Sequence, residues 1–132
     1  MINTDIYNYV NILDKAADAS SFRNELISNN IANVDTPDYK RKDLNFENIL
    51  QAELGGEKNL WTAVKNANMD LETLDPQVYT DNANLSYRLD GNNVDINTEE
   101  AYLAENQIKY QTLIDLMNQE FGRYKTAMSN GS

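Results

Sequence analysis

The stretch SNNIANVDTPDYKR, residues 28–41, decides how this chain folds. Its first part continues a helical pattern, because Ile27, Ile31 and Val34 are spaced by four and then three residues and so share one face of an α-helix. Asparagines near the end of a helix suit the free carbonyl groups there and tolerate left-handed dihedral angles. Pro37 then blocks further helix and favours extended geometry in the residue before it. We therefore expect a long helix that stops sharply and redirects the chain.

The segment before this turn is predicted to be one helix from about residue 4 to residue 33. Its apolar and small residues alternate steps of four and three, which is the spacing of a coiled-coil seam. The predicted seam consists of Ile6, Val10, Leu13, Ala17, Ser20, Asn24, Ile27, Ile31 and Val34. A helix of about thirty residues spans roughly 45 Å, which is long for a domain of this size. Such a helix is more often an assembly or coiled-coil element than a core helix.

A second long helix is predicted over residues 97–132, with Asn97 as its N-cap and Glu100 three residues later in the arrangement of a capping box. Its stripe repeats the same alternation through Leu103, Gln107, Tyr110, Ile114, Met117, Phe121, Tyr124 and Met128. The predicted fold class is therefore mainly α, with the two terminal helices paired antiparallel. One pairing cannot hide both stripes, so we expect apolar surface to remain on the outer faces.

The segment between the two helices is less regular. The predicted division is an N-terminal assembly helix over residues 1–34, a middle segment over 35–96 and a C-terminal assembly helix over 97–132. A short helix is predicted over 43–54, where apolar residues recur at helical spacing before a Gly-Gly pair. A small β-hairpin is predicted over 85–96, where alternating apolar residues flank the turn pair Asp90-Gly91.

Composition excludes several classes of function. The net charge of −10 argues against nucleic-acid binding and against adsorption to anionic membranes. The chain has no histidine and no cysteine, which removes the usual zinc sites and the Ser-His-Asp and Cys-His catalytic arrangements. The acidic stretch from Asp90 to Glu100 fails the calcium-loop pattern, because Val94 stands where an oxygen ligand is needed. We expect no catalytic residue, metal, cofactor or small-molecule substrate.

The run Lys40-Arg41-Lys42 is a basic cluster directly after the turn. Such a run is usually a solvated loop. The alternative is a salt-linked contact with an acidic neighbouring subunit.

The residues around this turn resemble the N-terminal signature of bacterial flagellar rod and hook proteins, roughly N-N-x-A-N-x-x-T-P-G-Y. The matching residues are Asn29, Asn30, Ala32, Asn33, Thr36, Pro37 and Tyr39. Asp38 stands where that family usually has glycine. This position often needs a positive φ when proline precedes it, and aspartate adopts such a φ at modest cost.

Three stretches are similar to the FlgB family of proximal rod proteins, namely residues 87–95, 103–107 and 110–111. The resemblance implies a structural subunit of the flagellar basal-body rod, which polymerises through its terminal helices into the torque-transmitting axial tube. It implies as partners other rod proteins, copies of the chain itself, the adaptor FliE, and the MS-ring and export apparatus. It also implies type III export into the periplasmic rod without a cleaved signal peptide.

Two other classes of protein share some of these features. A soluble helical adaptor or export chaperone would have amphipathic helices but would not need the asparagine-threonine-proline turn. A carboxylate-based hydrolase would need a pair of acids such as Glu47 and Asp70 in one cleft, and nothing in the sequence brings these two together.

Overall fold

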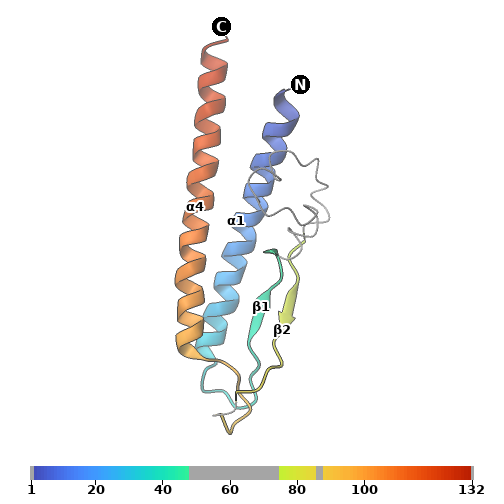
Figure 1. Cartoon of the computed structure of the whole chain (residues 1–132), viewed down its shortest axis with the longest axis vertical. Helices are drawn as coiled ribbons and strands as arrows, with labels where there is room; N and C mark the ends of the chain where they lie inside the picture. Colours follow the sequence, from blue (N-terminus) through green and yellow to red (C-terminus); the bar gives the residue numbers. More distant parts are fainter. Residues whose placement is uncertain (1, 48–74, 86–87, 132) are drawn as a thin grey trace.

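A computed structural model describes residues 2–47, 75–85 and 88–131, and the side chains from residue 9 onward within them. The element order is α1 (Ile2–Ala32), β1 (Lys42–Leu44), β2 (Val78–Thr80) and α4 (Ile96–Ser129). The two helices run antiparallel beside each other, with both chain ends at the same end of the molecule (Figure 1). The mainly helical fold and the pairing of the two long helices are confirmed.

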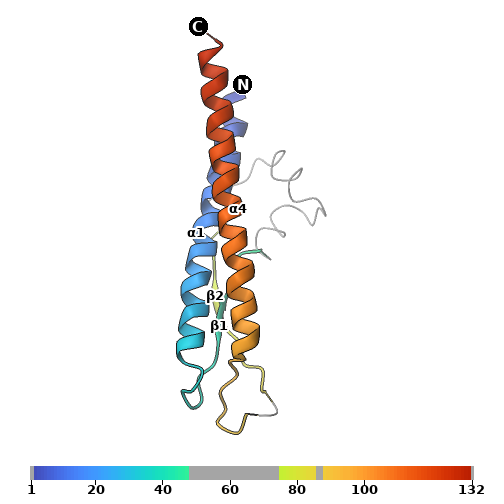
Figure 2. The same ribbon diagram turned by 90° about the vertical axis from the view of Figure 1, so that its left-hand side faces the viewer.

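Helix α1 lies between α4 and the two strands (Figures 1 and 2). It therefore needs two buried stripes. One is the predicted seam, in which Leu13, Ala17 and Ile27 are buried. The second follows the same four-three spacing on the adjacent helical face and consists of Ile12, Ala16, Ala19, Arg23, Leu26 and Asn30. Arg23 and Asn30 bond to residues of β1, so this second stripe faces the sheet.

The polar residues in the middle of the predicted seam have partners on α4. The side chain of Asn106 is buried and donates hydrogen bonds to the Ser20 carbonyl at 2.6 Å and to Asn24 Oδ1 at 2.8 Å. Towards the chain ends the contact becomes apolar, and Met117 is buried with Leu113, Ile114 and Leu116 packed against the core. The polar centre fixes the register of the two helices, because any sliding would leave a buried amide without partners.

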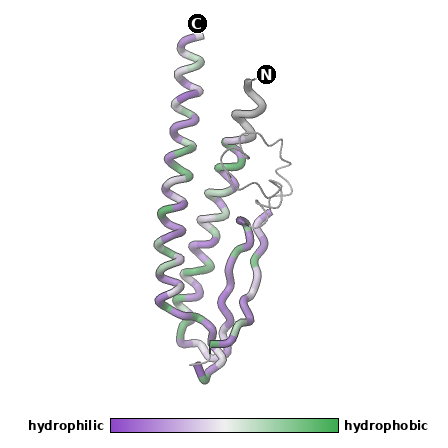
Figure 3. The backbone as a smooth tube through the Cα atoms, viewed as in Figure 1, coloured by the Kyte–Doolittle hydropathy of each residue, from purple (hydrophilic) through white to green (hydrophobic). Residues whose placement is uncertain are grey.

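Apolar and polar residues alternate along the whole of α4 rather than separating into blocks (Figure 3). Of its predicted stripe, Met117 is buried and Leu103, Ile114 and Tyr124 are partly buried. Tyr110 and Phe121 are exposed. On α1, Val10 and Ile31 are partly buried, and the side chain of Ile6 lies outside the described residues. No helix in the described part of the chain has both the length and the apolarity required to cross a membrane.

The small sheet forms from other residues than predicted. Strands β1 and β2 pair antiparallel with Asp43 opposite Tyr79. The short helix predicted over 43–54 was wrong at its start, because residues 42–44 are a strand, and its remainder from residue 48 lies outside the described residues. The hairpin predicted over 85–96 was also misplaced, since its described residues form a turn and irregular backbone that lead into α4.

Helix α4 begins one residue before the predicted start. Asp95, and not Asn97, is the N-cap, and its carboxylate accepts hydrogen bonds from the backbone N–H groups of Asn97 and Thr98. The prediction chose the wrong capping residue because both are good caps and stand two positions apart. The shift matters for function, since it places Glu99 in the first turn facing inward.

Candidate functional site

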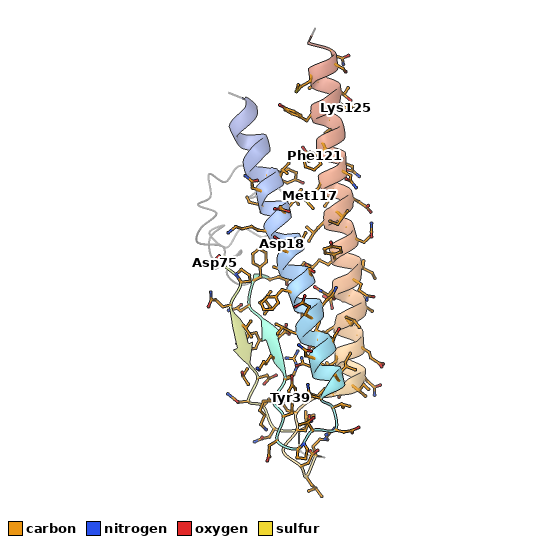
Figure 4. All side chains as sticks on the ribbon, turned by 180° about the vertical axis from the view of Figure 1, so that it is seen from behind. Asp18, Tyr39, Asp75, Met117, Phe121 and Lys125 are labelled. Atoms are coloured by element: carbon orange, nitrogen blue, oxygen red, sulfur yellow. The ribbon has the colours of Figure 1, made fainter. Side chains whose placement is uncertain are left out.

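Four segments meet at the end of the molecule opposite the chain termini. The end of α1, the turn after it, the segment after β2 and the first turn of α4 converge there, close to Tyr39 (Figure 4). Their contact is polar and buried, and we call it the polar junction. Its buried members are Asn30, Arg41, Asp43, Asn92, Asn93 and Glu99.

Arg41 is the centre of the polar junction. Its Nε donates to Glu99 Oε1, and its two terminal nitrogens donate to Asp43 Oδ2 at 3.0 Å and to Asp81 Oδ2 at 3.4 Å. Glu99 is only 1% exposed, so its carboxylate takes its hydrogen bonds from Arg41 Nε and from the Asn30 amide in place of water. Burial would lower the pKa of Arg41, but the hydrogen bonds to Glu99 and Asp43 outweigh it and raise the pKa above its ordinary value. Arg41 thus joins β1, the segment after β2, and α4.

Asp43 lies between two arginines. Arg23 of α1 binds it through Nε at 2.8 Å and Nη2 at 3.2 Å, which is the paired geometry that suits a carboxylate. Burial would raise the pKa of Asp43, but the bonds donated by Arg23, by the Leu44 N–H and by Arg41 together hold it below its ordinary value. The ring of Tyr102 lies 5.4 Å from the guanidinium of Arg23 and 5.5 Å from that of Arg41.

The Asn30 side chain forms hydrogen bonds with β1 like those that the backbone of a neighbouring strand would form. Its amide donates to the Lys42 carbonyl at 2.8 Å, and its oxygen accepts from the Lys42 N–H at 2.9 Å. The amide also donates to Glu99 Oε2 at 3.1 Å, and the oxygen accepts from the Tyr39 hydroxyl at 3.2 Å. All of its hydrogen-bonding capacity is therefore used inside the protein. A shorter or charged residue could not make this set of bonds.

The turn after α1 is held by Asn92, which lies in the segment before α4. The amide of Asn92 donates to the carbonyls of Asn33, Val34 and Thr36, at 2.8, 3.0 and 2.8 Å. These carbonyls belong to the turn that follows α1, and those of Asn33 and Thr36 also accept backbone N–H groups within the turn. Asn93 acts similarly on the segment after β2, donating to the Asp81 and Ala83 carbonyls while it accepts from the Arg41 N–H at 2.7 Å.

Asp38 has the left-handed backbone that the turn requires, with a φ of 59°. Its N–H donates to the Asp90 carbonyl at 2.8 Å. Gly91 packs against Asp38 and has a φ of 76°. A Cβ atom added to Gly91 would lie 2.3 Å from Asp38 Oδ1. The position where the flagellar signature has glycine therefore does adopt positive φ, and it is matched by a glycine across the junction.

The predicted motif residues have separate tasks. Asn30 and Tyr39 belong to the polar junction, and Asn33 accepts a hydrogen bond from Thr36 Oγ1 at 3.1 Å. Asn29 contributes its carbonyl to the Asn33 side chain. Ala32 and Pro37 are exposed and contribute through backbone shape. The solvated interpretation of Lys40-Arg41-Lys42 was wrong for Arg41, which is buried and paired within the chain.

Five residues of the site were not predicted from the sequence: Arg23, Asp43, Asn92, Asn93 and Glu99. In the sequence, Glu99 looks like an ordinary acid in the first turn of a helix, and Arg23 looks like a residue on a helix surface. No local spacing distinguishes them. Only the positions of Asn92 and Asn93 within residues 87–95, which resemble FlgB proteins, indicate a special role.

The chemistry of the polar junction is structural. Its carboxylates accept from arginine, and every buried side-chain nitrogen or oxygen in the described ranges has a hydrogen-bond partner. A network with all its members satisfied rigidifies the segments that it joins.

Comparison with known proteins gives this architecture a family. A family model described as "Flagella basal body rod protein" matches residues 15–40, which cover the second half of α1 and the turn. The chain is 35% identical to the "Flagellar basal body rod protein FlgB" of Bacillus subtilis, over 90% of this chain and 92% of that protein. The chain belongs to the FlgB family. The FlgB of Borreliella burgdorferi is 31% identical over 89% of this chain and 93% of its own length, and that of Escherichia coli K12 is 27% identical over 83% and 85%.

As a FlgB-family member, the chain is a structural subunit of the flagellar basal-body rod and assembles with other rod components in the basal body. The region matched by the family model contains Asn30 and the turn that Asn92 holds.

Changes at Asp38 and Gly91 test the geometry of the turn. Asp38→Gly should leave the free energy of unfolding within about 1 kcal/mol of the parent, on the stabilising side, because glycine has no Cβ penalty at positive φ. Gly91→Ala should lose about 1–3 kcal/mol through strain and the clash with Asp38. The double variant should recover part of that loss in urea unfolding. Simple additivity of the two changes would show that the residues do not touch.

Acid unfolding tests the bonds to Asp43. Because its pKa is depressed in the folded state, the unfolded chain binds more protons, and the contribution of Asp43 is present above about pH 4 and lost as pH falls through its folded pKa. Asp43→Asn should lower stability at pH 7 and flatten the loss of stability below about pH 4. Parallel curves of unfolding free energy against pH for the two proteins would contradict this assignment.

Proposed function

We propose that this FlgB-family subunit polymerises through the open faces of its two terminal helices, as part of the proximal rod. The observation that carries the proposal is an apolar stripe on α4 that the chain itself covers only in part. We call it the outer stripe, and it consists of Ile96, Leu103, Tyr110, Phe121 and Met128. Phe121 and Met128 remain 56% and 62% exposed, although each has a large apolar side chain.

The outer stripe lies beside the intramolecular interface. Three of its residues each lie four positions after a buried residue of α4. Leu103 follows Glu99, Tyr110 follows Asn106, and Phe121 follows Met117. Four residues turn a helix by about 40° beyond a full turn. The stripe therefore borders the α1–α4 contact, and a helix from a neighbouring subunit laid along this border would cover it. The steps between stripe residues are seven, except for eleven from Tyr110 to Phe121, and both spacings keep residues near one helix face.

The polar junction supports this function by fixing the two helices relative to each other. A torque-bearing subunit must keep its contact surfaces in a constant relation, and a satisfied buried network does that better than an apolar contact that can slide. Asn106 adds a second fixed point on the same pair of helices.

We further propose FliE, the MS-ring and export apparatus and other copies of the chain as neighbours, and type III export as the route to the periplasmic rod. Membership of the FlgB family makes other rod proteins its partners. The same membership is the reason for proposing FliE, the MS-ring and the export apparatus. We assign no catalysis. The acids of the polar junction are held by arginines, Glu47 pairs with Lys109, and Asp70 lies outside the described residues. A helical adaptor or chaperone would not need a rigid turn of this kind.

Phe121→Asp tests the outer stripe (Figure 4). Since Phe121 is largely exposed in the single chain, the thermal midpoint of the purified variant should stay close to that of the parent. In a strain lacking this protein, the variant should be made and exported but should not restore motility or rods, because assembly would bury the new charge.

Asp115→Asn is the matched control, since Asp115 is exposed on another face of α4, and it should restore both motility and rods. Equal behaviour of the two variants would refute the assigned face. Intact rods in the deletion strain itself, seen by basal-body imaging, would refute the proposed function.

A further inference from the structure

Helix α1 has a third face that points away from both α4 and the sheet. We call it the acidic face. Its exposed residues follow steps of four and three, with one phenylalanine beside them, and they are Asp14, Asp18, Ser21, Phe22, Glu25 and Ser28. Within the described residues, none of its three acids forms an ion pair. Phe22 adds a large apolar side chain that is 39% exposed. This face therefore offers unpaired negative charge around an aromatic ring.

The last turns of α4 carry the complementary groups, at the end where α4 extends further than α1 (Figure 1). Phe121, Lys125 and Met128 follow steps of four and three there and are all exposed, and we call them the terminal patch. Phe121 and Lys125 are labelled in Figure 4. Arg123 in the same turns pairs with Glu120, whereas Lys125 forms no ion pair in the part of the chain that the structure describes.

Gly122 lies beside the terminal patch, and no contact among the described residues accounts for it. Glycine inside a helix is less favourable than alanine, because it loses more conformational freedom on folding. A Cβ atom added to Gly122 would meet no described atom within 4 Å. A glycine does allow the backbone of another helix to approach closely. It is thus a second, independent indication that a helix packs against this end of α4.

The acidic face and the terminal patch cannot meet within one chain. Asn106 of α4 bonds to the Ser20 carbonyl and to Asn24, so it lies level with about residue 22 of α1. Because the helices are antiparallel, Asp18 is level with about residue 110 and lies about 22 Å along the axis from Lys125. Figure 4 shows the two side chains well apart along the helix pair. Another molecule is needed to bring these opposite charges together.

We propose that the terminal patch of one copy packs antiparallel against the acidic face of a second copy, with Lys125 beside Asp18. This inference rests on the proposed rod function, and it names the neighbouring helix that covers the end of the outer stripe. Charge complementarity across a contact favours the correct partner and register more than it adds affinity.

The same register also matches the uncharged residues of the two surfaces. If Lys125 lies opposite Asp18 in an antiparallel pair, Phe121 lies opposite Phe22 and Gly122 lies opposite Ser21. The two aromatic rings then bury each other, and rings in contact stabilise an interface beyond the area that they bury. The two small residues let the helix backbones approach at this level.

This contact arranges the copies as a polar filament requires. Since α1 and α4 are antiparallel within each copy, antiparallel packing between copies makes all of them point the same way (Figure 1). The two surfaces differ, so the contact is heterologous and can repeat from copy to copy. Residue 22 of α1 faces Asn106 within its own chain and Phe121 of the neighbour. These two positions are fifteen residues apart, so neighbouring copies should be offset by about 22 Å along the helix axis.

Cysteine crosslinking tests the contact directly, since the native chain has no cysteine. Ser21→Cys and Gly122→Cys are introduced singly and together into the full chain, in a strain lacking the native protein, and assembled basal bodies are oxidised. Because a disulfide needs Cβ atoms about 4 Å apart, the double variant should give about tenfold more linked product than either single variant. The product should be a ladder of dimers, trimers and larger species, since every copy carries both cysteines.

Ser28→Cys combined with Gly122→Cys is the matched control. Ser28 is an exposed serine on the same face of α1, but it lies about 10 Å further along the helix, so this pair should give no ladder.

Each other outcome of the crosslinking overturns a stated part of the account. Rods that assemble without a ladder would refute the contact while leaving the rod function intact. Product that stops at dimers would show a contact that closes on itself. A crosslink to a different protein alone would refute a second copy as the occupant. Normal rods in the strain without the chain would refute the rod function instead.

Charge exchange gives a second test that does not depend on crosslinking. Asp18→Lys and Lys125→Asp should each leave the thermal midpoint of the purified monomer near that of the parent, because both side chains are exposed. Each should reduce the number of rods about tenfold by placing like charges across the contact, and the double variant should restore them. Asp35→Lys reverses an exposed acid on the turn after α1, and combined with Lys125→Asp it should not restore rods. Full motility of both single variants, or a double variant without rescue, would overturn the proposal.

Discussion

The buried ion pair between Arg41 and Glu99 is the interaction on which the rest of this structure depends. It joins the segment after the first helix to the first turn of the second, two stretches separated by 58 positions in sequence. Neither charge is tolerable there alone, so each holds the other in place. Asn30 and Asp43 complete the set of bonds, and through them α1 and β1 acquire fixed positions relative to α4.

The long helices and their antiparallel pairing could be predicted because hydrophobic period is a local property. The positive φ at position 38 could be anticipated from the preceding proline and the glycine expected there. The polar junction could not, because Arg41, Asp43 and Glu99 look like surface charges until tertiary contacts bring them together. The strand at residues 42–44 was missed for the same reason. The Asn30 side chain forms hydrogen bonds with the backbone of Lys42 in this strand, and the local sequence of residues 42–44 does not predict that contact.

Rigidity and open surface are complementary in this subunit. The polar junction and Asn106 fix the helix pair, while Phe121 and Met128 remain available to neighbours. A subunit that hid all its apolar surface would be a stable monomer with no reason to polymerise. One without the junction would offer the same stripe in changing orientations, which a torque-bearing tube could not use.

A double-mutant cycle on Arg41 and Glu99 tests this account most directly. Urea unfolding of Arg41→Met and of Glu99→Gln should show losses of about 3–5 kcal/mol for the arginine change and somewhat less for the neutral isostere. The double variant should lose less than the sum, with a coupling energy of about 1–3 kcal/mol. Strict additivity, or losses below about 0.5 kcal/mol as for ordinary surface residues, would contradict the central role of the pair.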